Sequence, residues 1–211
     1  MNIVLHGNTF RLLPEKALFW EEYGLMIIAD LHLGKAMHFR KAGIPMPELS
    51  ALKDYENLNA LIGVYHPEQI CFLGDLFHSN YNTEWRLFET FIEQNPHVHF
   101  SLIKGNHDIL KDEHYEALGI ELIDDQLALG NVILSHIPIT HPPEGNINIS
   151  GHLHPGCVLR GLGRQSVKLP CFVYYRNTFL LPAFGHLTGL HVVQQIGAVY
   201  YAIAGDRIVM M

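Results

Sequence analysis

Apolar and polar positions along the chain form short β-type runs at both ends and helix-type runs in the middle. Before Asp30 the apolar residues alternate with polar ones or form brief continuous runs, which predicts strands over 2–7, 9–13, 17–24 and 25–30. The last of these runs is apolar up to Asp30, as in a strand that is buried on both faces. After Gly119 the pattern returns and predicts strands over 120–125, 127–136, 146–152, 171–184, 191–205 and 206–211.

The middle of the chain has apolar residues three and four positions apart, the spacing of one face of a helix. We expect one helix to begin near Pro47 and another to cover 82–94, with Asn82 or Thr83 as its N-cap. A third is expected over 109–118. We interpret the apolar stripes as core-facing surfaces; they contain Leu49, Leu52, Tyr55, Leu58, Leu61 and Ile62 in the first helix and Trp85, Phe88, Phe91 and Ile92 in the second.

Strands therefore flank a helix-containing middle and dominate the second half of the chain. This order fits an α/β (α+β) fold in which two mixed β-sheets pack together with helices outside them. The chain has 211 residues and shows no internal repeat, low-complexity tract or linker, so we expect one domain over 1–211.

Composition narrows the class of protein. Hydrophobic residues make up 48% and charged residues 17%, which indicates a substantial core rather than disorder. No apolar stretch reaches the roughly 18 residues that span a membrane, and the first residues lack the cationic start of a signal peptide. Three cysteines without a CxxC pair are typical of reduced thiols in a cytoplasmic protein. The net charge of −7 argues against binding long duplex DNA by charge alone.

Potential metal ligands stand where five of the apolar runs end. Ligands that leave the same ends of neighbouring strands converge on one crevice of a sheet. The last two ligands are two residues apart, so we expect them to share one face of a strand. In chain order the candidates are Asp30 and His32, then Asp75, Asn106 and His136, and finally His152 and His154.

These side chains offer oxygen and imidazole ligands and no thiolate, which suits Mn, Fe, Zn or Co better than a structural zinc site. Seven ligands are too many for one four-coordinate ion but suit two ions that share a carboxylate, for which Asp75 is the natural candidate. Taken singly, Asp30 is also a common turn residue, and a lone histidine such as His136 is more often a hydrogen-bonded core residue. The joint occurrence of all the ligands favours the metal site.

At these positions the chain resembles the calcineurin-like metallophosphoesterases. The family pattern DxH, GD, GNHD, H and GHxH is present at 30–32, 74–75, 105–108, 136 and 151–154. The resemblance implies a four-layer α/β/β/α sandwich and two divalent ions, with Mn²⁺ expected and Fe, Zn or Co as alternatives. It implies that one ion takes Asp30, His32, Asp75 and His154, and that the other takes Asp75, Asn106, His136 and His152.

The same resemblance implies a mechanism and its residues. A metal-bridging hydroxide would attack phosphorus in line, and His107 would meet the phosphate and act as the acid for the leaving oxygen. Asp108 would either orient His107 or cap the helix expected over 109–118. Lys35 and Arg40 are candidate substrate contacts because they follow the first metal motif most closely, with ordinary solvated cations as the alternative.

A narrower resemblance runs almost from end to end. The segments 30–36, 42–47, 151–155 and 181–189 are similar to the DNA ligase-associated branch of bacterial metallophosphoesterases. It implies association with a DNA ligase and a helicase, and a role in DNA repair. His186 and Leu190 depart from that branch, in the tail rather than in the metal motifs, so the departure bears on substrate contacts only.

The sequence therefore predicts a metal-dependent phosphoesterase, with a phosphodiesterase or nuclease acting on DNA as the first hypothesis. The alternative is a phosphatase or phosphodiesterase of nucleotides or small phosphoesters, because motif spacing does not separate these substrates. A non-catalytic scaffold is disfavoured, since such a protein would be expected to lose ligands or the acid histidine. A partner would supply the DNA affinity that a chain of charge −7 lacks.

Overall fold

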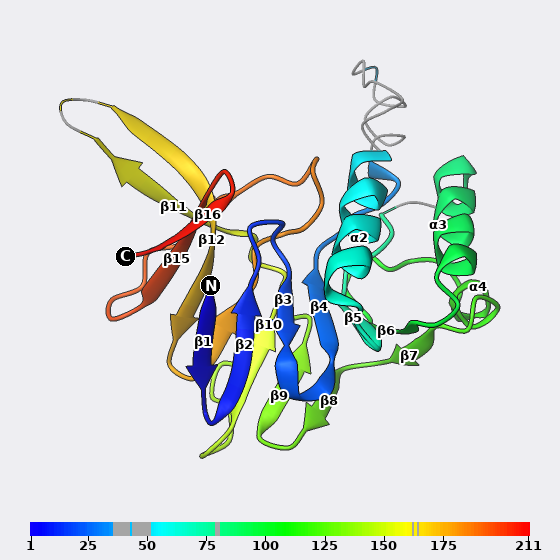
Figure 1. Ribbon diagram of the computed structural model, residues 1–211, viewed down its shortest axis with the longest axis horizontal. Helices are drawn as coiled ribbons and strands as arrows, with labels where there is room; N and C mark the ends of the chain where they lie inside the picture. Colours follow the sequence, from blue (N-terminus) through cyan, green and yellow to red (C-terminus); the bar gives the residue numbers. More distant parts are fainter. Residues whose placement is uncertain (36–42, 44–51, 79–80, 162, 164) are drawn as a thin grey trace.

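The computed structural model describes residues 1–35, 43, 52–78, 81–161, 163 and 165–211, and it contains two β-sheets packed face to face with helices on one side (Figure 1). The first sheet has seven strands in the order β1 to β7. The strands β1 to β4 form an antiparallel meander, and β4 to β7 run parallel. Their bounds are β1 (Asn2–Leu5), β2 (Asn8–Leu12), β3 (Leu18–Trp20), β4 (Leu25–Ala29), β5 (Gln69–Leu73), β6 (His99–Ile103) and β7 (Glu121–Ile123).

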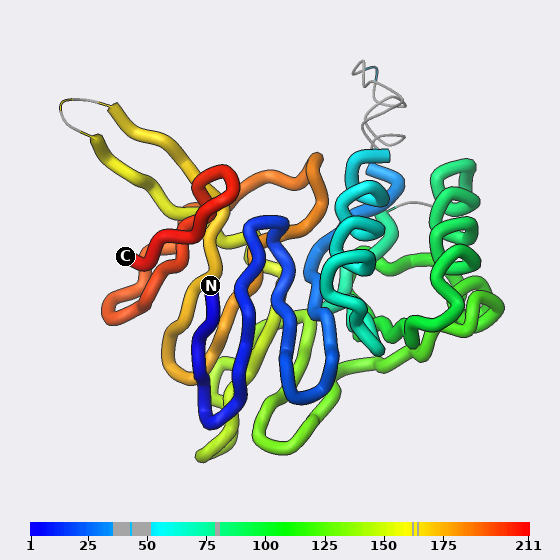
Figure 2. The backbone as a smooth tube through the Cα atoms, in the orientation of Figure 1, coloured from blue at the N-terminus to red at the C-terminus, as the bar shows by residue number. Residues whose placement is uncertain are grey.

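The second sheet holds all the later strands. Its main path is β14-β11-β12-β13-β10-β9-β8, and β15 pairs with β12 and with β16. At its centre β9, β10 and β13 run parallel. The backbone trace starts in β1 of the first sheet and ends in β16 of the second (Figure 2). The bounds are β8 (Gln126–Leu129), β9 (Val132–Ser135), β10 (Ile147–Ser150), β11 (Pro155–Arg160), β12 (Ser166–Tyr175), β13 (Thr178–Leu180), β14 (His191–Val192), β15 (Val199–Ala204) and β16 (Arg207–Met210).

Alternate side chains of the central strands face two different cores. In β4, Met26 and Ile28 pack with the helices, whereas Leu25, Ile27 and Ala29 pack between the two sheets. This explains why the strand is buried throughout and reads as one apolar run. The helix-side core includes residues of every described α-helix, namely α2 (Leu52–Tyr65), α3 (Thr83–Gln94) and α4 (Asp112–Glu116). A short 3₁₀ helix, η1 (Glu21–Tyr23), joins β3 to β4.

The fold class predicted from the sequence is confirmed, because the chain forms two packed mixed sheets flanked by helices. The described helices lie on the first sheet only, so this part of the chain has three layers, α/β/β, rather than four (Figure 1). After α4 every described element is a strand. The outer face of the second sheet instead packs its own side chains, Cys157, Cys171, Val173, Leu180 and Ala202.

The helices lie where the apolar stripes predicted them, but their ends differ from the predicted ones. Helix α3 is capped by Asn82, whose side-chain oxygen accepts the backbone N–H groups of Glu84 and Trp85 at 2.8 and 3.3 Å. Helix α2 is described from Leu52, and the expected start near Pro47 lies outside the described residues, as does Leu49. The helix expected over 109–118 is only the short α4. None of the described helices is long and apolar enough to cross a membrane.

Candidate metal centre

The predicted ligands come together where parallel strands of both sheets end. Asp30 directly follows β4, Asp75 follows β5, and Asn106 follows β6 in the first sheet. His136 directly follows β9 in the second sheet, and the two last histidines follow β10. The crevice is therefore built by the carboxyl ends of neighbouring strands, as the sequence predicted.

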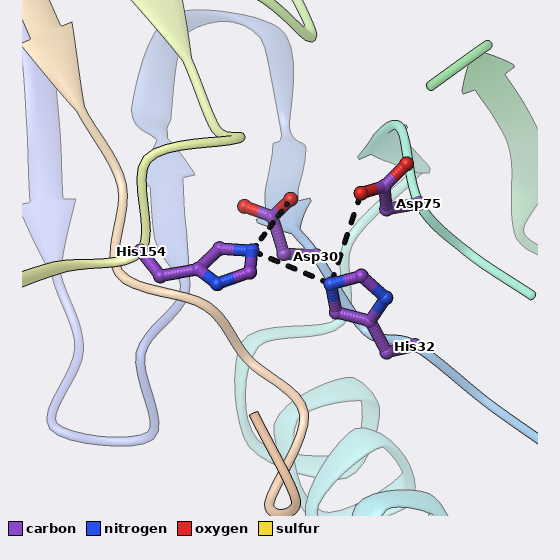
Figure 3. A group of neighbouring side chains, drawn as sticks. All are labelled: Asp30, His32, Asp75 and His154. Atoms are coloured by element: carbon purple, nitrogen blue, oxygen red, sulfur yellow. Dashed lines mark hydrogen bonds and ion pairs between the residues drawn. The ribbon is translucent and has the colours of Figure 1, made fainter. Parts of the chain in front are cut away.

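One group of side chains contains Asp30, His32, Asp75 and His154, and its ligand atoms all lie within 4.8 Å of one another. The Nε2 atom of His154 lies 3.4 Å from Oδ1 of Asp30, and Nε2 of His32 lies 3.7 Å from Oδ2 of Asp75. The two imidazoles approach each other at 3.3 Å (Figure 3). Two carboxylates and two imidazoles thus face one point.

A second group contains Asp75, His136 and His152, again within 4.8 Å. The Nε2 atom of His136 lies 3.5 Å from Oδ1 of Asp75 and 3.1 Å from Nδ1 of His152. The side-chain oxygen of Asn106 lies 3.1 Å from the same Nε2 atom. Asn106 therefore joins the second group, as the resemblance implied.

Asp75 belongs to both groups through different oxygens. Its Oδ2 atom is the one nearest His32, whereas its Oδ1 atom faces His136. Oδ1 also accepts the backbone N–H of His107 at 2.9 Å, which fixes the orientation of the carboxylate. A carboxylate held this way can offer one oxygen to each of two ions.

Backbone contacts orient the other ligands. The Nδ1 atom of His136 lies 2.9 Å from the carbonyl oxygen of Leu73, which leaves Nε2 of the ring facing the centre. Oδ2 of Asp30 accepts the backbone N–H of His152 at 2.8 Å. Each of these contacts joins the end of a strand in one sheet to a ligand of the other.

Five of the ligands have a left-handed backbone. Asp30, His32 and Asp75 have φ of 53°, 50° and 51°, and His152 and His154 have φ of 69° and 46°. Residues other than glycine rarely take this conformation, at an energetic cost of order 1–3 kcal/mol each, and such residues cluster at functional sites.

The prediction that His152 and His154 share a strand face is wrong, because both lie after β10 in a loop where their backbones are left-handed.

Three glycines of the motifs allow the loops to meet. A Cβ atom on Gly74 would overlap the His136 ring and lie 2.8 Å from the Cα atom of Gly105. A Cβ atom on Gly105 would overlap Asp75, and one on Gly151 would lie 2.6 Å from Oδ2 of Asp30. A side chain at any of these positions would therefore push a ligand out of place.

The chemistry of the site fits divalent cations. Asp30 is completely buried and Asp75 is 2% exposed, and Oδ1 of Asp30 has no hydrogen-bond donor within the described ranges. Burial lowers the pKa of His32 to about 2, and the charges of Lys35 and His154 act in the same direction. The imidazole is therefore neutral and has a lone pair to donate. Buried carboxylates beside neutral imidazoles are stabilised by a metal ion, which supplies the missing positive charge.

His107 lies at the mouth of the centre and is exposed. Its ring packs on that of His78 with centroids 4.2 Å apart, and both rings contact His32, at 5.7 and 5.3 Å. His78 follows Asp75 by three positions and is not one of the ligands predicted from the sequence. Its contact with His107 depends on the folded loops and has no sequence signature.

The main contacts of Asp108 differ from both roles that the sequence suggested, which were to orient His107 or to cap the following helix. Its carboxylate accepts the backbone N–H groups of Gly105, Leu76 and Phe77 at 2.8, 2.9 and 3.1 Å. It thereby holds the loop after β6 against the loop after β5. The N-cap of α4 is Lys111, so Asp108 does not cap that helix. Burial raises the pKa of Asp108 to about 6.

Of the two candidate substrate contacts, one can be placed. Lys35 is half-buried beside the first group, where burial lowers its pKa although Asp75 and Asp30 act to raise it. Its positive charge therefore lies close to both metal-binding carboxylates. Arg40 lies outside the described residues.

Two solved structures are similar to this chain. The solved structure of the nuclease MPE from Pseudomonas putida is similar to the chain at 28% identity and a TM-score of 0.84, over 100% of this chain and 99% of that one. The phosphoesterase Yfce from E. coli is similar at 16% identity and a TM-score of 0.45, over 89% and 97% of the chains. A comparison with curated proteins gave no match.

A family model provides the assignment. The model described as calcineurin-like phosphoesterase matches residues 24–143, which is more than half of the chain and includes the ligands from Asp30 to His136. The full-length similarity to the Pseudomonas putida nuclease is consistent with the narrower resemblance found in the sequence. The chain therefore belongs to the calcineurin-like phosphoesterase family and is a metal-dependent phosphoester hydrolase.

Proposed function

We propose that the protein is a two-metal phosphodiesterase that cleaves nucleic acid as a nuclease. The observation that carries this proposal is the position of Asp75, which presents one oxygen to each of two groups of ligands. Two ions that share a carboxylate are suited to the displacement of one oxygen of a phosphoester by another. The similarity in structure to a nuclease over the whole chain supports the choice of substrate.

In this proposal the chain holds one ion with Asp30, His32, Asp75 and His154 and the other with Asp75, Asn106, His136 and His152. The oxygen and imidazole ligands suit Mn²⁺, with Fe, Zn or Co as alternatives. When bound, the two ions supply Lewis acidity, which lowers the pKa of water toward neutrality and offsets charge on the phosphate.

The chain's own residues position and protonate the substrate. His107 is exposed beside the centre, and its backbone N–H is fixed on Asp75, so its ring is available to protonate or hydrogen-bond the leaving oxygen. Acid assistance of this kind accelerates a reaction by about 10²–10⁴. Lys35 adds positive charge next to the carboxylates, and Arg40 is proposed as a second phosphate contact. Asp108 supports His107 indirectly, by fixing the loop that carries it.

Exposed aliphatic residues that are close in the chain to the site residues support a substrate larger than a small phosphomonoester. Ile109, Ile137 and Leu153 are 63%, 58% and 38% exposed, and each stands within two residues of His107 or of a metal-binding histidine. Exposed aliphatic side chains around a polar centre provide contacts for the sugars and bases on either side of a phosphodiester. A phosphatase or phosphodiesterase of nucleotides or small phosphoesters is the second candidate.

The biological setting remains part of the proposal. The narrower resemblance supports action on DNA in repair together with a DNA ligase and a helicase, and the three free cysteines support a cytoplasmic protein. The acidic net charge of −7 favours a partner that supplies DNA affinity. A scaffold without activity is disfavoured by the complete ligand set.

The first experiment compares Mn²⁺-loaded protein on bis-p-nitrophenyl phosphate and on p-nitrophenyl phosphate. We expect hydrolysis of the diester and its loss in Asp75→Ala, while the exposed-surface variant Asp125→Ala keeps it. Cleavage of single-stranded and duplex DNA is then measured with the same three proteins. Preference for the monoester would move the assignment to a phosphatase, and inactivity of metal-loaded protein on all substrates would contradict catalysis by the chain alone.

A further inference from the structure

The segment Phe184-Gly185-His186, called the strap below, lies across the end of β4. The backbone N–H of Phe184 donates to the carbonyl of Ala29 at 2.8 Å, and that of Gly185 donates to the carbonyl of Asp30 at 3.2 Å. A Cβ atom on Gly185 would overlap the carbonyl oxygen of Leu31, so the strap contacts that residue directly. The strap therefore touches three consecutive backbone units that include a metal ligand.

Two charged side chains, the partly buried Lys16 and the buried Asp54, hold the strap from the other side. The ammonium group of Lys16, in the turn between β2 and β3, donates to the carbonyl of Phe184 at 2.5 Å. The carboxylate of Asp54, in the first turn of α2, accepts the backbone N–H of His186 at 3.0 and 3.4 Å. The charges thus anchor the strap immediately before and immediately after Gly185.

Both charges lie in surroundings that disfavour them. Burial lowers the pKa of Lys16, although Asp54 acts to raise it. Burial raises the pKa of Asp54 to about 6, against the hydrogen bond from His186 and the charge of Lys16. In the described chain neither side chain forms an ion pair within 4.0 Å, so each is directed at the strap rather than at a charged partner. A fold that needed only packing here would be served by apolar residues.

The strap bears on the strained part of the metal centre. Asp30 and His32 have left-handed backbones, which persist only where neighbouring structure restrains them. The strap supplies such a restraint at the carbonyl of Asp30. The side chain of His186 is exposed and only its backbone N–H is used, so another residue at this position would serve equally well.

We propose that Lys16 and Asp54 are positioning residues of the metal centre, which act through the strap to hold Asp30 and His32 in their ligand conformations. This inference rests on the proposed two-metal function, and it concerns metal affinity rather than the choice of substrate. Residues that hold ligands in place change metal affinity by about 10–100-fold when they are replaced. Residues that only stabilise the fold lower the melting temperature and leave the affinity of the folded protein unchanged.

The test compares Asp54→Leu and Lys16→Met with the wild-type protein. Glu84→Leu is the control for Asp54→Leu. Glu84 and Asp54 are each 7% exposed, and each stands in the first turn of a helix, α3 and α2 respectively. The readouts are the Mn²⁺ dissociation constant of apo protein, by titration calorimetry well below its melting temperature, and the visible absorption of the Co²⁺-loaded protein. Neither readout requires turnover, so an inactive wild-type protein would overturn the proposed function without deciding this test.

We expect Asp54→Leu and Lys16→Met to bind Mn²⁺ about 10–100-fold more weakly and to change the Co²⁺ spectrum. Asp54→Asn keeps an acceptor for the N–H of His186, so its affinity should return most of the way to the wild-type value. Wild-type affinity and spectrum in Asp54→Leu and Lys16→Met, with a lower melting temperature alone, would overturn the proposal. If Asp54→Leu does not fold, Lys16→Met decides by the same two readouts.

Discussion

The carboxylate of Asp30 accepts the backbone N–H of His152 at 2.8 Å and thereby joins the two β-sheets at the metal centre. Asp30 directly follows β4 of the first sheet, whereas His152 follows β10 of the second. The other oxygen of this carboxylate, Oδ1, lies 3.4 Å from Nε2 of His154, a ligand of the same group. One side chain therefore serves both as a ligand and as a link between sheets.

Replacing Asp30 by Asn tests its role as a metal ligand. Asn keeps the size of the side chain but removes the negative charge, so we expect Mn²⁺ affinity to fall by more than the roughly 10–100-fold typical of residues that only support ligands. Titration calorimetry of the apo protein measures the loss. Wild-type affinity in Asp30→Asn would contradict its assignment as a ligand.

Asp75→Ala should remove both ions, because the lost carboxylate serves both groups of ligands. Metal analysis after dialysis gives the stoichiometry, with Asp125→Ala as a surface control. His136→Ala, by contrast, removes a ligand of the second group only and should leave one ion bound. Two bound ions per chain in Asp75→Ala would refute the shared position.

His107→Ala should keep its metal ions and lose turnover. The ring stands at the mouth and belongs to neither group of ligands, so its removal takes away acid assistance worth about 10²–10⁴ in rate. The loss is measured as kcat on bis-p-nitrophenyl phosphate at saturating Mn²⁺. His78→Ala removes the ring that packs on His107 and should lower kcat by less. A metal-free His107→Ala protein would instead place this residue among the ligands.

Gly74→Ala should destabilise the protein and disturb the second group of ligands. Its φ of 70° is unfavourable for alanine, and the new Cβ would overlap the His136 ring. Gly7→Ala is a matched control, since Gly7 has φ of 82° and open space around its Cβ position. We expect Gly7→Ala to lose about 1–3 kcal/mol of unfolding free energy and Gly74→Ala to lose more. Equal losses, with intact metal binding in Gly74→Ala, would show that the close contact has no effect.

Asp54 should make stability depend on pH between about 4 and 6. Its pKa is raised from 3.8 to about 6 by burial, so the native state binds its proton more tightly than the unfolded state. The stabilising effect of that proton is complete below pH 3.8 and disappears as the pH rises through 6. The unfolding free energy of the wild type should therefore fall relative to Asp54→Asn by up to about 3 kcal/mol over this range.

Urea unfolding of metal-free protein at several pH values measures this difference. Lys16 and Lys53 face the carboxylate and favour its charged form, so Lys16→Met should enlarge the effect. A stability difference between the wild type and Asp54→Asn that stays constant from pH 4 to 7 would contradict the raised pKa.

The clustering of the candidate ligands could be predicted from the sequence because each stands where an apolar run ends. Asp30 and Asp75 follow strands that are buried on both faces, and the parallel arrangement of β4 to β6 brings such ends together. Periodicity likewise located α3, whose apolar face is fully used in the core. These features depend on local pattern, which a sequence displays directly.

The supporting residues could not be found in this way. Asp108 hydrogen-bonds to the loop after β5, and Lys16 reaches a carbonyl 168 positions away in the chain, so neither contact has a local pattern. Asp54 is the exception, because one feature of the sequence indicates it. It is a charged residue four positions before Leu58, within an otherwise apolar stripe of α2. The left-handed backbone conformations of the ligands have no signature in the sequence, because backbone strain depends on tertiary contacts.

Because the ligands come from two sheets, residues deep in the interior affect the geometry of the active site. Each group combines side chains from both sheets, so sliding one sheet over the other by a fraction of an ångström would change the distances between the ligands of the first sheet and those of the second. What resists that sliding is the close-packed layer between the sheets, in which Ala29, Leu73 and Ile149 lie beneath the centre. The thickness of this layer therefore sets the distance between the ligands that the two sheets contribute to each group, and we expect conservative substitutions there to change the reaction rate without touching metal or substrate.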